Sequence, residues 1–103
     1  MSNPIVVGTD TVTSRDYPVA SGEGVLEAGR LLKLDSGKLK ACNTGDTPHS
    51  ILLEDIDATS ADAECFYLNR GVVAEDEVDY GDGSADEFRE ALRAVGIILQ
   101  MPR

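Results

Sequence analysis

Two short runs with apolar residues at strand-like intervals stand out in the chain. They span Arg30–Leu34 and Lys38–Cys42. Asp35, Ser36 and Gly37 separate them, and the glycine can adopt the left-handed conformation that a tight turn requires. The pattern therefore predicts a β-hairpin with its turn at these three residues.

Shorter apolar runs predict further strands on both sides of the hairpin. The Gly-rich stretch Ser21–Gly24 marks the start of a compact β region, with strand-like spacing from Val25 onward. The later runs are Ser50–Leu53, Ala63–Leu68, Val72-Val73 and Ile97–Leu99. We expect Asn69, Arg70 and Gly71 to turn the chain into the run that follows them, and Gly71 would suit a bend or a bulge.

One helix is predicted near the C-terminal end of the chain. Ser84 and Glu87 form the capping box S-x-x-E, with Ser84 as the N-cap. An apolar face follows at helical spacing, formed by Phe88, Leu92 and Val95. Gly96 then provides a stop signal. The fold is therefore expected to be mainly β, with one short C-terminal helix before the last strand.

The first twenty residues are rich in Thr, Ser, Asp, Gly and Pro around one short apolar run, Ile5, Val6 and Val7. They carry too little apolar surface to fold alone. Two interpretations stay open: a frayed tail, or an extended arm that becomes ordered as a strand on a partner. The sequence thus predicts a flexible N-terminal arm over residues 1–20 and a single small β-rich domain over residues 21–103.

The distribution of charged side chains along the chain disfavours some classes of binding partner. The net charge is −10, yet five of the nine basic and five of the nineteen acidic side chains lie in residues 1–40. Residues 41–103 therefore hold four basic against fourteen acidic side chains. This balance argues against a nucleic acid or an anionic membrane surface as partner. No membrane-spanning run or signal peptide is recognisable, so synthesis in the cytoplasm is expected.

The residues that could carry chemistry form no recognisable site. Cys42 and Cys65 lack zinc-ligand spacing and are expected to be reduced and semi-buried. His49, the only histidine, is expected to be solvated in a polar loop. The acidic stretch Glu75–Gly83 is out of register with a calcium-loop pattern, which favours a solvated loop. We therefore expect no catalytic, cofactor or metal site, and a protein that is not an enzyme.

Three stretches of sequence resemble a known family. They are GRLLKLDSGKLKAC, HSILLEDIDATSADAECFYLNRGVV and FREALRAVGIILQ, within about residues 20–100. In this order they are similar to the head decoration proteins of tailed phages, the lambda-type capsid-stabilising proteins. The resemblance implies a β-clip-like fold and a homotrimer that binds the outer surface of the expanded capsid at three-fold positions. Ile5, Val6 and Val7 would then contact the major capsid protein.

Other functions stay open at this point. An acidic inhibitor that mimics DNA would use the negative charge to bind a basic DNA-processing enzyme. A tail or other virion module could share the same fold. A nucleotide hydrolase of the β-clip type would require motif residues that the chain does not show. The resemblance favours a structural virion protein that stabilises the capsid.

Overall fold

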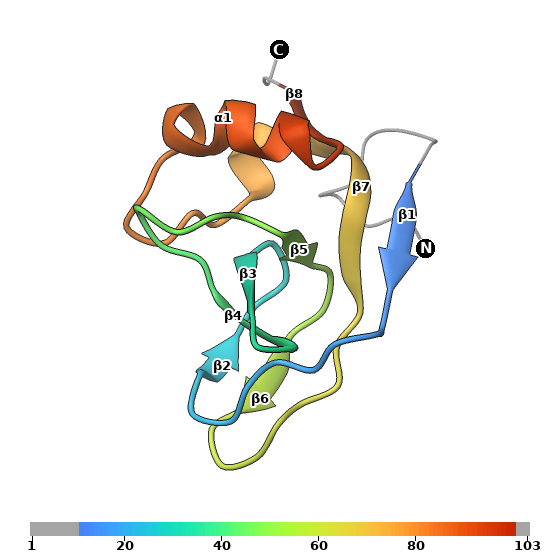
Figure 1. Cartoon of the computed structure of the whole chain (residues 1–103), viewed down its shortest axis with the longest axis vertical. Helices are drawn as coiled ribbons and strands as arrows, with labels where there is room; N and C mark the ends of the chain where they lie inside the picture. Colours follow the sequence, from blue (N-terminus) through green and yellow to red (C-terminus); the bar gives the residue numbers. More distant parts are fainter. Residues whose placement is uncertain (1–10, 101–103) are drawn as a thin grey trace.

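The computed structural model describes residues 11–100, which form a mainly β domain with one α-helix (Figure 1). Its elements, in chain order, are β1 (Val12–Ser14), β2 (Gly24–Leu26), β3 (Leu31–Asp35), β4 (Lys38–Ala41), β5 (Ser50–Leu52), β6 (Ile56–Ala58), β7 (Tyr67–Ala74), the 3-10 turn η1 (Glu75–Glu77), α1 (Ala85–Ala94) and β8 (Ile97–Gln100). The predicted fold class, a small β domain with one C-terminal helix, is confirmed.

Most of the strands belong to one sheet. Its order is β1-β7-β5-β3-β4, and β8 pairs in parallel with β7. β2 and β6 form a separate ribbon at the lower end of Figure 1, and α1 lies across the upper end. β7 is central because Leu68 pairs with Thr13 of β1 on one side and with Ile51 of β5 on the other.

Different parts of the chain cover the two faces of the sheet. One core lies under α1 and contains Leu31, Ile51, Leu68, Val73, Phe88, Leu92 and Ile97. Successive residues of a strand point to opposite faces, so Leu32 belongs to the second core. That core also contains Val19, Leu26, Leu39, Leu52, Ala58, Cys65 and Tyr67. The ribbon and the segment before it therefore cover the face opposite the helix.

The predicted hairpin is confirmed. Asp35 at the end of β3 pairs with Lys38 at the start of β4, which leaves a two-residue loop. Ser36 and Gly37 both have positive φ, 54° and 81°. This combination belongs to a type I′ turn, whose twist matches the twist of the flanking strands.

The turn predicted at Asn69, Arg70 and Gly71 is wrong, because β7 runs through all three as one strand. Its first half pairs with β1 and β5, and its second half pairs with β8 from Gly71 onward. Leu68 and Val73 both face the core under α1 although they are five positions apart, an odd step that would place them on opposite faces of a regular strand. The strict alternation therefore shifts by one residue near Gly71, whose φ is +144°. The irregularity expected near this glycine is present within the strand and not at a turn: Val12 and Thr13 of β1 pair with Arg70 and Leu68, so the register skips Asn69.

The predicted helix is confirmed with two corrections. Ser84 Oγ accepts a hydrogen bond from Glu87 N at 3.3 Å, as an N-cap should. The Glu87 carboxylate bonds instead to the Thr44 hydroxyl and to Gly45 N, so only half of the capping box forms. Val95 is the C-cap and is 41% exposed, so it lies outside the packed face of the helix.

The described half of the predicted arm belongs to the folded domain. Residues 12–14 form β1, and Val19 is fully buried between Leu39 and Ala63. The Ala63 end of the strand predicted at Ala63–Leu68 forms only this isolated bridge. The proposed capsid-contacting residues Ile5, Val6 and Val7 lie outside the described residues.

Candidate binding surface

β1, the first described strand after the predicted contact residues in the sequence, lies at the edge of the main sheet. Within residues 11–100 it pairs only with β7, in a register that runs from Val12 opposite Arg70 to Ser14 opposite Tyr67. An edge strand has backbone N–H and C=O groups with which another strand can pair. β1 is therefore the described segment best placed to continue strand pairing to a partner.

Gly71 allows the start of β1 to lie close to β7. A Cβ atom at position 71 would stand 3.2 Å from Thr11 Oγ1 and 3.3 Å from Thr11 Cα, which is tighter than ordinary contact. Its φ of +144° is also one that side chains rarely adopt. Thr11, the first described residue, is therefore held beside β7 by a contact that requires glycine.

Side-chain contacts attach the rest of this segment to the sheet. Asn69 Nδ2 donates to Ser14 Oγ at 3.0 Å. The Arg15 guanidinium lies over the Phe66 ring, 4.8 Å from its centroid, and Nη1 is 3.7 Å from Glu54 Oε2. Because Arg15 and Glu54 are well exposed, their ion pair adds little stability and mainly fixes direction.

His49 is packed and is not the solvated histidine that the sequence predicts. Its ring is half-buried between Tyr17 and Tyr67, with ring centroids 6.1 and 6.0 Å away. Burial lowers the pKa of His49 below its ordinary value. Nδ1 lies 3.0 Å from Ser50 Oγ, but Ser50 is fully buried and cannot meet a substrate. The histidine therefore anchors the segment after β1 to the second core.

The cysteines are core residues on opposite faces of the sheet. Cys42 belongs to the core under α1 and Cys65 to the second core, and both are free thiols. They are fully buried, where semi-burial was expected. Burial raises the pKa of each thiol to about 11, so neither is a reactive thiolate near neutral pH.

The acidic stretch Glu75–Gly83 is partly packed, in contrast to the solvated loop that was predicted. Val78 is buried, and Tyr80 stacks on Phe88 at a centroid distance of 6.3 Å. Glu75 forms an ion pair with Arg89 of α1. Within the described part of the chain, no three His, Cys, Asp or Glu side chains are grouped to hold a metal ion.

A buried arginine joins this stretch to the hairpin, and the sequence analysis did not single it out. Arg30 is 9% exposed, and its Nη1 donates to the carbonyl oxygens of Cys42 at 2.7 Å and Asp79 at 3.2 Å. Its Nη2 donates to Asn43 Oδ1 at 2.8 Å. The only available sequence signal was an arginine at the start of an apolar strand, so this role depended on contacts distant in sequence.

Comparisons with known proteins add no family to this description. No protein-family model and no curated protein matches the chain. Of the helices within residues 11–100, none has the length and apolar character to cross a membrane.

Proposed function

We propose that the chain is a structural virion protein: a trimeric head decoration protein that binds the outer surface of the expanded phage capsid at three-fold positions. It would stabilise the shell there by binding the major capsid protein. The observation that carries the proposal is the edge strand β1, which follows the β-branched run Ile5, Val6 and Val7 in the chain. A segment of this kind can add a strand to a partner through backbone hydrogen bonds.

The anchored base of β1 supports this proposal. Thr11 lies against Gly71, Ser14 is bonded to Asn69, and Arg15 stacks on Phe66. A strand that binds a partner holds its own domain there only if the strand is firmly attached to the core of that domain. These contacts supply that attachment on the strand that leads to the proposed contact residues.

The mechanism is linkage between binding and the state of the shell. A ligand that binds only the expanded lattice shifts the equilibrium toward it by mass action. Three arms on one trimer act at a high effective concentration, so weak single contacts sum to firm attachment. Catalysis and cofactors have no part in this mechanism. The negative charge would keep free copies soluble and apart from packaged DNA.

Backbone pairing by the arm is tested with two substitutions at one position. Val6→Pro removes a backbone N–H and restricts φ, whereas Val6→Thr keeps a β-branched side chain and the N–H. Both proteins are mixed with expanded capsids that lack the decoration protein and are then sedimented. We expect Val6→Thr to pellet with the shells and Val6→Pro to stay in the supernatant. Equal binding by the two variants would contradict strand pairing at this position.

The alternative of a DNA-mimic inhibitor lacks a comparable observation. Several acidic side chains form ion pairs within the described residues, namely Asp35, Asp46, Glu54, Asp62, Glu75, Asp86 and Glu90. They are spread over the hairpin, the loops and α1, and no single helix carries them in a row. This distribution favours the structural role.

A further inference from the structure

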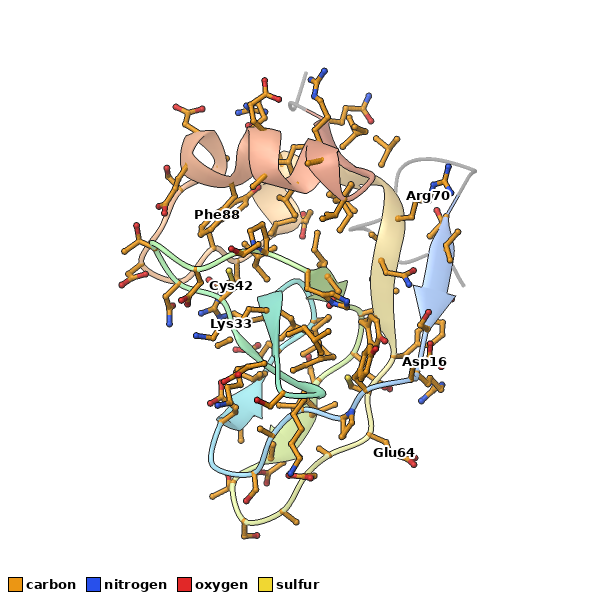
Figure 2. The ribbon with its side chains drawn as sticks, viewed as in Figure 1. Asp16, Lys33, Cys42, Glu64, Arg70 and Phe88 are labelled. Carbon is orange, nitrogen blue, oxygen red and sulfur yellow. The ribbon has the colours of Figure 1, made fainter. Side chains whose placement is uncertain are left out.

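Arg70 is an exposed cation of an acidic protein, and no carboxylate within residues 11–100 pairs with it (Figure 2). Other basic side chains of the described region each have an acidic partner, namely Arg15, Lys33, Lys38, Lys40, Arg89 and Arg93. Arg30 bonds to carbonyl oxygens instead. Within residues 11–100, Arg70 alone has neither kind of partner.

Two exposed valines flank this arginine. Val12 is 45% exposed and is the register partner of Arg70 on β1. Val95 is 41% exposed and precedes Gly96, where an added Cβ atom would stand 3.2 Å from Arg70 Cγ. We name Val12, Arg70 and Val95 the basic patch. Arginine surrounded by apolar groups is typical of the centre of a protein interface.

A second patch of the opposite charge lies on the β2–β6 ribbon. Val25 is 67% exposed, and its register partner on β6 is the exposed Asp57. Glu27, two residues after Val25, directly follows β2 and begins the turn that the hydrogen bond from Arg30 N to its carbonyl oxygen closes. The Glu27 side chain is exposed and has no hydrogen-bond or ion-pair partner within the described residues. We name Val25, Glu27 and Asp57 the acidic patch.

The two patches lie toward opposite ends of a molecule whose longest extent is 40 Å. Arg70 is labelled near the α1 end in Figure 2, and the β2–β6 ribbon occupies the other end in Figure 1. One copy therefore cannot bring its own two patches together. A neighbouring copy can, through a head-to-tail contact that closes into a ring when the rotation between copies permits it.

We propose that the basic patch of one copy binds the acidic patch of the next, so that Arg70 pairs with Glu27 between exposed valines. The occupant is a second copy because that chain itself offers the complementary charge and an exposed apolar side chain. That three copies form the closed ring rests on the proposed function. The contact between two neighbouring copies is inferred from the two patches alone. In an interface of this kind, the charged pair fixes how the two copies are aligned, and burial of the apolar side chains stabilises their association.

Charge exchange tests the contact. Arg70→Glu and Glu27→Arg each place like charges opposite each other, and the double variant restores an opposite pair. Association is measured from the weight-average mass by sedimentation equilibrium over a range of concentrations. We expect each single variant to associate at least about tenfold more weakly, as for a residue at the centre of an interface. The double variant should recover most of the loss.

Lys40→Glu is the matched control. It changes the net charge as Arg70→Glu does, but it lies on β4 of the hairpin. It should associate as the original chain does, and circular dichroism should show the same fold for all variants. Single reversals without effect, or a double variant as weak as the singles, would overturn the contact.

The failure of this inference and the failure of the proposed function can be told apart. Trimers that are insensitive to both reversals but bind expanded capsids would leave decoration standing and overturn the contact. A charge-reversible contact in a protein that ignores capsids would support the contact and count against decoration. A chain that stays monomeric at all concentrations would overturn the contact.

Discussion

Arg30 joins three segments that are far apart in the sequence. Its guanidinium donates to the carbonyl oxygens of Leu31, Cys42 and Asp79 and to the side chain of Asn43. The bond to the Cys42 carbonyl oxygen is buried, so without Arg30 this acceptor would lose its partner inside the protein. The carbonyl oxygens of Leu31 and Asp79 also accept from Cys42 N and Leu31 N. Arginine is suited to this task because its donors form a rigid planar fork.

Replacement of this arginine should therefore be costly. We expect Arg30→Met, which keeps much of the volume, to lower the free energy of unfolding by about 1–3 kcal/mol, mainly because the buried carbonyl oxygen of Cys42 loses its donor. Urea unfolding measures this value. Arg93→Met, on the exposed side of α1, is the control and should change stability by less than about 0.5 kcal/mol. Equal effects of the two changes would refute the role of Arg30.

His49 makes the stability depend on pH in a defined direction. Burial lowers its pKa, so the folded state binds a proton less readily than the unfolded state. The contribution of neutral His49 to stability is thus fully present above the ordinary histidine pKa, and it is lost as pH falls toward the lowered pKa of the folded state. We expect the original chain to lose more stability than His49→Asn between pH 7 and pH 5.5, measured by urea unfolding. Parallel losses in the two proteins would argue against this assignment.

At the scale of elements, Gly71 controls how β1 meets β7. Gly71→Ala would place a Cβ atom close to Thr11 and would strain a backbone with positive φ. Gly22→Ala is the matched control, since Gly22 also has positive φ but has open space around its Cβ position. We expect Gly71→Ala to destabilise the fold more, by about 1–3 kcal/mol. Backbone amide shifts should change along β1 in Gly71→Ala only; an unperturbed β1 would speak against the close approach.

Glu87 fixes a loop and not the helix end. Its carboxylate accepts hydrogen bonds from the Thr44 hydroxyl at 2.7 Å and from Gly45 N at 2.9 Å. Glu87→Ala should therefore speed amide hydrogen exchange at Gly45 while the first turn of α1 stays protected. Ser84→Ala should instead speed exchange in the first turn of α1 while Gly45 stays protected, and it should lower the free energy of unfolding by about 1 kcal/mol. Faster exchange at the helix start in Glu87→Ala would indicate a complete capping box.

The elements predicted correctly have signals in adjacent residues. The hairpin has a turn glycine between two runs with apolar residues at strand-like intervals, and α1 has its cap and apolar face within one segment. β6 was missed because Ile56–Ala58 lies in an acidic stretch and becomes a strand by pairing with the distant β2. The turn predicted within β7 was wrong for the same reason, since β8 arrives as a partner only after α1.

The candidate surface could be predicted only in part. The β-branched run at Ile5, Val6 and Val7 indicated an arm, but it falls outside the described residues. The anchoring of β1 and the position of Val19 in the core depend on contacts with β7, Leu39 and Ala63. That no carboxylate within residues 11–100 pairs with Arg70 likewise depends on the folded structure, which pairs the other bases with acidic side chains.

At the scale of the whole molecule, the boundary between arm and domain decides how a truncation should behave. β1 and the buried Val19 belong to the fold, so the removable segment is residues 1–10 and not the first twenty. We expect deletion of residues 1–10 to leave a folded, associating protein that no longer binds capsids. Deletion of residues 1–19 should lower the thermal midpoint markedly, because it removes an edge strand and a core side chain. Normal capsid binding by the protein that lacks residues 1–10 would refute the role of the N-terminal arm in capsid binding.

In the proposed function, the chain binds the expanded capsid from outside and stabilises it. Co-sedimentation of the full chain with expanded and with unexpanded shells that lack the decoration protein tests this, with the mass of the free protein measured by light scattering. We expect a trimer that pellets with expanded shells only. A monomer that pellets with neither kind of shell would contradict it.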